Sequence, residues 1–137
     1  ERSLHQLHAL SHPLPHTIAV LGSGLNLAWL AAPWLQKCEV AYWGDLDTWG
    51  LAMLATARRH LPHLHALLMD RATFDAHAHL AVHEPVPCND LPMDALTPQE
   101  GALAEHLRGL ALGRLEQEFV AGPAVAAAVA NWLKTCE

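Results

Sequence analysis

The hydrophobic positions in the centre of the chain predict a strand, a helix and a second strand in succession. Residues 40–43 and 65–69 are short apolar runs of the kind that form buried strands. Between them, apolar residues recur at helical spacing from Leu51 to Ala55, and Pro62 ends that segment. Because a helix joins the two strands, we expect a βαβ crossover in a largely parallel sheet.

The region before this unit predicts one more strand. Residues 17–21 are apolar and partly β-branched, and the turn Gly22-Ser23-Gly24 leads out of them. A Gly-x-Gly turn after a strand can also hold a phosphate, but no third glycine or lysine follows here, which favours a simple close turn. Short helices are expected over residues 2–10 and 26–32.

The last part of the chain is predicted to be mostly helical. Residues 71–93 are expected to hold at most one short helix, near residues 73–79. Thr97-Pro98-Gln99-Glu100 is a capping box with proline at the first helical position. The helix that it opens is expected to end at Gly113, and residues 114–120 to form a further short helix. Gly122-Pro123 then starts an alanine-rich final helix.

Length and composition limit the possible function classes. A chain of 137 residues suits one domain, with an α/β core over residues 1–70 and a loop and helical extension over 71–137. The net charge of −6, with only eight Lys and Arg, argues against a chain that wraps nucleic acid unaided. No apolar run of about 18 residues predicts a membrane span. Three widely spaced cysteines are typical of reduced thiols, so we expect a cytoplasmic protein.

The turn Gly44-Asp45-Leu46-Asp47 is the strongest candidate for chemistry. It follows the strand over residues 40–43 directly, and Thr48 can cap the next helix. Open α/β sheets bind their ligands at the carboxyl ends of the strands. Two carboxylates so close together repel each other unless a cation lies between them, so the turn predicts a divalent metal. The alternative interpretation is that the turn uses aspartate only to cap the next helix. A cap needs just one aspartate, however, and the turn has two.

The sequence disfavours two other kinds of site. A phosphatase that uses the first aspartate of a DxD motif as nucleophile needs Thr or Val where Trp49 stands, and a downstream lysine, for which only Lys134 is present. Eleven histidines suggest zinc, but no CxxC or HExxH spacing occurs, so surface histidines are favoured. Tyr42 lies within the predicted buried strand, which favours hydrolysis by water over a tyrosine nucleophile.

Four short motifs carry a family resemblance. The sequence YWGDLDTWG at residues 42–50, followed by an arginine, a proline and LLMD, resembles the Toprim nuclease domain of the JetD subunit of Wadjet anti-plasmid systems. Residues 96–100 resemble the "LT..E" segment of that family, and residues 115–118 resemble its "LEQE" segment. The matches follow the order of the family and run through most of the chain.

The resemblance implies a fold and a catalytic set. The fold would be Toprim-like, that is, a Rossmann-like, mostly parallel sheet with flanking helices and a helical C-terminal tail. Toprim domains also use a glutamate that ends an earlier strand, and only Glu1 stands in that place, so the first strand is expected to be missing from this chain. Glu1, Asp45 and Asp47 would then hold one or two Mg²⁺ or Mn²⁺ ions for DNA hydrolysis. Asp70 either joins this acidic cluster or caps the segment after it.

The resemblance also implies supporting residues and partners. Arg114 is the candidate for a DNA-phosphate contact, and Glu116 and Glu118 would bind metal or position Arg114; on a helix, at most one of the two glutamates would face the site. Gly44 and Gly50 flank the acidic turn. The family implies a homodimer and a condensin-like SMC motor complex that delivers plasmid DNA. Two alternatives stay open, namely a non-catalytic Toprim-like module kept for assembly and a small-molecule phosphohydrolase.

Overall fold

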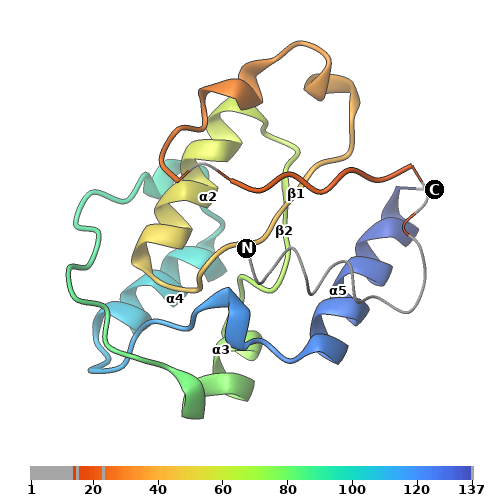
Figure 1. Cartoon of the computed structure of the whole chain (residues 1–137). Helices are drawn as coiled ribbons and strands as arrows, with labels where there is room; N and C mark the ends of the chain where they lie inside the picture. Colours follow the sequence, from red (N-terminus) through yellow and green to blue (C-terminus); the bar gives the residue numbers. More distant parts are fainter. Residues whose placement is uncertain (1–13, 15, 23, 137) are drawn as a thin grey trace.

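The computed structural model describes residue 14 and residues 16–22 and 24–136. A parallel two-stranded sheet runs through the middle of this part, with α2 and α4 on one side and α5 on the other (Figure 1). The helix expected over residues 2–10 and the candidate ligand Glu1 lie outside the described residues.

The sheet pairs β1 (Ala41–Tyr42) with β2 (His65–Ala66), and Ala41 lies opposite His65. Hydrogen bonds from the His65 amide to the Val40 carbonyl and from the Leu67 amide to the Tyr42 carbonyl, 2.9 and 2.8 Å long, complete the parallel ladder. The intervening helix is the crossover. The predicted α/β class and βαβ unit are therefore confirmed, with strands shorter than the apolar runs that predict them.

Helix α2 (Thr48–His60) connects the strands and buries Leu51, Leu54 and Ala55, as their spacing predicts. The prediction that Thr48 caps it was wrong. The N-cap is Asp47, whose Oδ1 accepts a hydrogen bond from the Gly50 amide at 2.7 Å. An aspartate in extended conformation one residue before the helix has the geometry of a cap, while Thr48 already belongs to the first turn.

The segment before the sheet differs from the prediction. Residues 17–21 form no strand, and Ile18, Val20 and Leu21 are exposed. Apolar β-branched residues form a strand only where a neighbouring strand pairs their backbone and another layer covers their side chains. Two short 3₁₀-helices follow, η1 (Ala28–Ala31) and η2 (Leu35–Lys37), because Pro33 interrupts the expected helix.

After β2, Asp70 caps helix α3 (Arg71–His77), which the 3₁₀-helix η3 (Ala78–Leu80) extends. The short helix near residues 73–79 is therefore present. The chain then crosses an irregular segment and a 3₁₀-helix, η4 (Met93–Ala95), which packs against α2.

Helix α4 (Pro98–Arg108) begins with the predicted capping box. The Glu100 amide donates to Thr97 Oγ1 at 3.2 Å, and the Thr97 amide donates to Glu100 Oε2 at 2.8 Å. The helix ends at its C-cap Gly109, earlier than expected. Gly113 lies at a close approach, because a Cβ there would stand 2.2 Å from the Leu107 carbonyl oxygen.

The helix expected over residues 114–120 was wrong. Arg114 and Leu115 are extended, and they form isolated antiparallel bridges with Val82 and Leu46. Only Gln117–Phe119 is helical, as the 3₁₀-helix η5. Leu115 is fully buried, and the bridge to Leu46 satisfies backbone groups that a buried irregular segment would leave unpaired.

Helix α5 (Gly122–Thr135) starts at the predicted Gly-Pro pair and buries Val125 and Val129. One hydrophobic core joins α2, α4 and α5; its largest fully buried apolar side chains are Leu46, Leu51, Leu54, Leu61, Met69, Leu107, Leu115 and Val125. Within the described ranges, none of the helices combines the length and the apolar character needed to cross a membrane.

Candidate functional site

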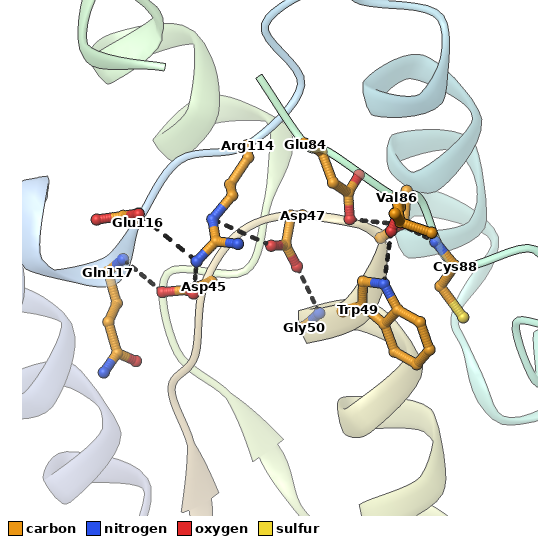
Figure 2. Close-up of polar contacts among 11 residues, drawn as sticks. Asp45, Asp47, Trp49, Gly50, Glu84, Val86, Cys88, Arg114, Glu116 and Gln117 are labelled. Carbon is orange, nitrogen blue, oxygen red and sulfur yellow. Dashed lines mark hydrogen bonds and ion pairs between the residues drawn. The ribbon is translucent and has the colours of Figure 1, made fainter. Parts of the chain in front are cut away.

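The acidic turn lies where β1 ends and α2 begins (Figure 2). Two segments that are distant in sequence lie beside it, one around Arg114 and one around Glu84. The segment around Arg114 reaches it through the Leu46–Leu115 bridge. The chain around Leu46 is extended, so residues 45 and 47 point to one face while Leu46 is buried on the other. This alternation directs both carboxylates of the DxD motif to the same place.

Arg114 occupies that place. Its Nη2 donates to Asp45 Oδ2 at 2.9 Å, its Nε lies 3.6 Å from Asp47 Oδ2, and its Nη2 lies 3.5 Å from Glu116 Oε1. Figure 2 shows the guanidinium group between the three carboxylates. The cation that the repulsion argument demanded is therefore present as a side chain of the protein itself.

The two aspartates differ in their surroundings. Asp45 is half-buried, and its Oδ1 also accepts a hydrogen bond from the Gln117 amide at 3.0 Å. Asp47 is only 2% exposed. Burial raises the pKa of Asp47, and the charges of Glu84 and Asp45 raise it further, against the lowering effects of the Gly50 hydrogen bond and of Arg114. A negative charge on Asp47 is therefore costly, and a nearby cation stabilises it.

A further carboxylate, Glu84, was missed by the sequence analysis. It is 6% exposed, its Oε1 accepts a hydrogen bond from Thr48 Oγ1 at 2.6 Å, and its charge raises the pKa of Asp47. The same Thr48 oxygen accepts from the Cys88 amide at 2.6 Å, which fixes the 84–88 loop to the start of α2. The only sequence signal is one acidic residue in the largely apolar stretch AVHEPVP.

The glycines of the motif make the turn possible. A Cβ at Gly50 would stand 1.8 Å from the Asp45 carbonyl oxygen, so the first turn of α2 contacts the backbone of the acidic turn too closely for any other residue. A Cβ at Gly44 would stand 2.5 Å from the Tyr42 hydroxyl oxygen. Burial raises the pKa of Tyr42, as do the charges of Asp45 and Asp47, so its phenol stays protonated.

The comparison with known families agrees with the motif. A family model described as Wadjet protein JetD, C-terminal, matches residues 3–128. The chain belongs to this JetD family. No curated protein matches the chain. Membership implies a role in the Wadjet defence system, as part of a multi-subunit complex.

In this JetD-family chain, four of the predicted site residues lie together, and Asp70 has a separate role. Asp45, Asp47, Arg114 and Glu116 come together. Asp70 takes the second of its two expected roles, because its Oδ1 accepts from the Thr73 amide at 2.7 Å and caps α3.

The glutamate pair of the "LEQE" segment is not on a continuous helix. Glu116 is the N-cap of η5, outside it, and Glu118 lies within it. Glu116 Oε1 lies 3.5 Å from Arg114 Nη2.

The donor atoms of the JetD-family site suit a hard cation. Asp45, Asp47 and the nearby Glu84 offer only carboxylate oxygens, the ligands that Mg²⁺ and Mn²⁺ prefer. The raised pKa of the buried Asp47 is the observation that fits such an ion, which would relieve the same repulsion as Arg114. Over the described residues, however, no three His, Cys, Asp or Glu side chains are grouped closely enough to hold a metal. The aspartates therefore fit as part of a ligand set.

Proposed function

We propose that the protein is a metal-dependent DNA endonuclease of the Toprim type that cleaves plasmid DNA in Wadjet defence. The observation that carries the proposal is the pair Asp45 and Asp47, whose carboxylates flank one cation at the carboxyl end of β1. The match to the JetD family supports the biological setting. Glu1 completes the proposed ligand set, on the family resemblance alone.

The residues of the chain prepare the site in three ways. The Gly50 amide fixes the orientation of Asp47, the Gln117 amide fixes Asp45, and the buried Leu46 holds the two in register. When bound, Mg²⁺ or Mn²⁺ supplies an activated water and neutralises charge on the scissile phosphate. Arg114 is the side chain of this site with the charge to contact a DNA phosphate.

The net charge of −6 shapes the proposed assembly. A protein with eight Lys and Arg has little capacity to neutralise a DNA backbone by itself. We therefore assign DNA delivery to partners, namely a second copy of the protein and a condensin-like SMC motor complex in the cytoplasm. The isolated protein is expected to cut plasmid DNA weakly or not at all.

Metal binding is tested by the melting temperature. Mn²⁺ should raise it in the wild type, and the double variant Asp45→Asn/Asp47→Asn should lose that rise, because asparagine keeps a capping oxygen but removes the charge. Asp70→Asn is the matched control, since it also changes an N-cap aspartate, and it should keep the rise. An equal rise in the double variant would place the cation elsewhere, most simply on the histidines.

Cleavage is tested in the complete Wadjet complex with plasmid DNA. Asp47→Asn should abolish cutting, and so should removal of divalent cations with EDTA, because the single positive charge of Arg114 cannot replace the charge and the activated water that a metal would supply. Cutting that persists in EDTA, or in the folded Asp47→Asn variant, would refute the nuclease assignment.

A second candidate is a Toprim-like module that is kept for assembly and has no catalytic role. The observation in its favour is that Arg114 already pairs with both aspartates while Asp47 caps α2, so both carboxylates have structural partners. This candidate predicts no Mn²⁺ effect on the melting temperature and unchanged plasmid cutting by the complex that carries Asp47→Asn.

A further inference from the structure

Arg114 makes a hydrogen bond with Asp45 but only a longer contact with Asp47. Its Nη2 makes a hydrogen bond of 2.9 Å with Asp45. Its Nε–H is buried and has no hydrogen-bond acceptor among the residues that the structure describes, because Asp47 Oδ2 lies 3.6 Å away, beyond hydrogen-bond distance. A buried N–H without an acceptor costs free energy, so the guanidinium group is an imperfect partner for Asp47.

The backbone of Arg114 is fixed, whereas its side chain has room to move. Two hydrogen bonds with Val82, 2.8 and 3.1 Å long, hold the backbone in the antiparallel bridge. The side chain is 31% exposed. The guanidinium group can therefore leave the carboxylates by rotation about side-chain bonds alone, with no change in the fold.

The charges around Arg114 favour a cation of higher charge. Asp45, Asp47 and Glu116 surround this single positive charge, and Glu84 adds its field at Asp47. One guanidinium group neutralises one carboxylate, so the cluster keeps a negative excess. A divalent ion carries twice the charge and binds carboxylate oxygens from any direction, without the planar geometry that a guanidinium group requires.

We propose that Arg114 is a built-in counter-cation that a divalent metal ion must displace from Asp45 and Asp47. In the metal-free protein it holds the two carboxylates together against their repulsion. Metal binding releases the guanidinium group toward solvent, where it is free to pair with an anion such as a phosphate group. The inference rests on the proposed function, because it needs the metal site at the two aspartates, and it adds a competition that sets the metal affinity.

Mn²⁺ affinity tests the exchange without any activity measurement. The dissociation constant of Mn²⁺ is measured by titration calorimetry, and the melting temperature in EDTA, for wild type, Arg114→Gln and Arg59→Gln. Arg114→Gln should bind Mn²⁺ roughly tenfold tighter, because the ion no longer competes with a bound cation. It should also melt at a lower temperature in EDTA, since the carboxylates then repel each other unopposed.

Arg59→Gln is the matched control. Arg59 pairs with the exposed Asp94 at 2.7 Å near the C-terminal end of α2, while Asp47 lies at the other end of that helix. The same substitution there removes one positive charge and one ion pair without touching the site. It should leave the Mn²⁺ dissociation constant unchanged within the error of the titration.

Two kinds of result distinguish failure of the Arg114 exchange from failure of the metal site itself. Wild-type affinity, or weaker binding, in Arg114→Gln would overturn the exchange and make Arg114 a fixed part of the site. If Arg114→Gln does not fold, Arg114→Lys replaces it and should bind more tightly than wild type, because lysine lacks the fork that spans two carboxylates. Mn²⁺ binding that is absent from wild type, or that survives Asp45→Asn/Asp47→Asn, would instead refute the metal site, and the exchange with it.

Discussion

At Asp47, one buried side chain serves two purposes that need different properties. Capping α2 needs only an acceptor oxygen, which the Gly50 amide uses at 2.7 Å. Binding a cation needs the charge, which burial makes costly. The two oxygens divide these tasks, because Oδ1 faces the helix and Oδ2 faces Arg114. The capping and metal interpretations of this residue are therefore compatible.

Gly50→Ala tests how tightly the turn is built. The added methyl would stand 1.8 Å from the Asp45 carbonyl oxygen, so either Asp45 or the start of α2 must shift. We expect a loss of about 2–4 kcal/mol in the free energy of unfolding, measured by urea denaturation. The Mn²⁺ response of the melting temperature should fall as well, because Asp45 carries one of the carboxylates.

Gly122→Ala is the control for this experiment. Gly122 is the first residue of α5, and no described residue lies within 4 Å of a Cβ built there, its neighbours in the chain apart. It should change the free energy of unfolding by no more than about 0.5 kcal/mol. Equal, small effects of the two substitutions would show that the acidic turn tolerates a side chain at residue 50.

At the scale of elements, one ion pair fixes the two helices on the same side of the sheet. Arg58 on α2 donates through Nη2 to Glu100 Oε1 at 2.9 Å, and Glu100 is also the acidic member of the α4 capping box. Both side chains are largely buried. Because α2 carries Asp47 at its start, this contact helps to set the position of the site helix.

The Arg58–Glu100 pair predicts a pH dependence of stability. Burial alone would raise the pKa of Glu100, but hydrogen bonds from Arg58 and Thr97 outweigh it and hold the pKa below its ordinary value of 4.5. A carboxyl group with a depressed folded-state pKa stabilises the protein above pH 4.5, and this contribution is lost as the pH falls through the folded-state pKa. The melting temperature should drop steeply in that acidic window.

Glu100→Gln isolates this contribution. At pH 7 it should cost about 1–3 kcal/mol, because a charge-assisted pair is lost. The difference from wild type should shrink as the pH falls below 4.5, the ordinary value for this group. Glu105→Gln on the same helix, where Glu105 pairs with Arg108 at an exposed position, should follow the wild-type profile. A constant difference between Glu100→Gln and wild type at all pH values would contradict the assignment.

Local signals made some elements and residues predictable. The capping box at Thr97 and the Gly-Pro start of α5 lie within one helical turn, and the DxD turn and its glycines are contiguous in sequence. The prediction of a helix over residues 114–120 failed because isolated antiparallel bridges with Val82 and Leu46, rather than local propensity, decide that backbone. Glu84 and the pairing of Arg114 with Asp45, 69 residues apart, depend on tertiary contacts that spacing does not encode.

At the scale of the whole molecule, the site depends on a small piece of backbone pairing. Arg114 and Leu115 join the acidic turn on one side, through Leu46, and the segment that leads to Glu84 on the other, through Val82. Four amide hydrogen bonds, 2.8 to 3.1 Å long, make up the two bridges. These contacts are few, whereas α2 is embedded in the core.

Hydrogen exchange measures how firmly this pairing holds. Closing a loop of about 70 residues costs roughly 4 kcal/mol of chain entropy, which four hydrogen bonds and the two buried leucines, Leu46 and Leu115, must offset. We expect the amides of Leu46, Val82, Arg114 and Leu115 to exchange with one common opening free energy, lower than that of Leu51 and Leu54 in α2. Exchange of the four as slowly as the α2 amides would contradict this.

Because the bridges are weaker than the helices, the site should be lost at a lower temperature than the fold. On warming, the two-bridge junction should open and release Leu46 and Leu115 from the core while the helices remain folded, so Asp45 and Asp47 would lose Arg114 and their fixed spacing first. A sample that has lost the proposed metal binding could still give the circular dichroism of a folded protein, and it would recover on cooling. A partner that grips residues 113–117 would raise the temperature at which the site fails without changing the temperature at which the protein melts.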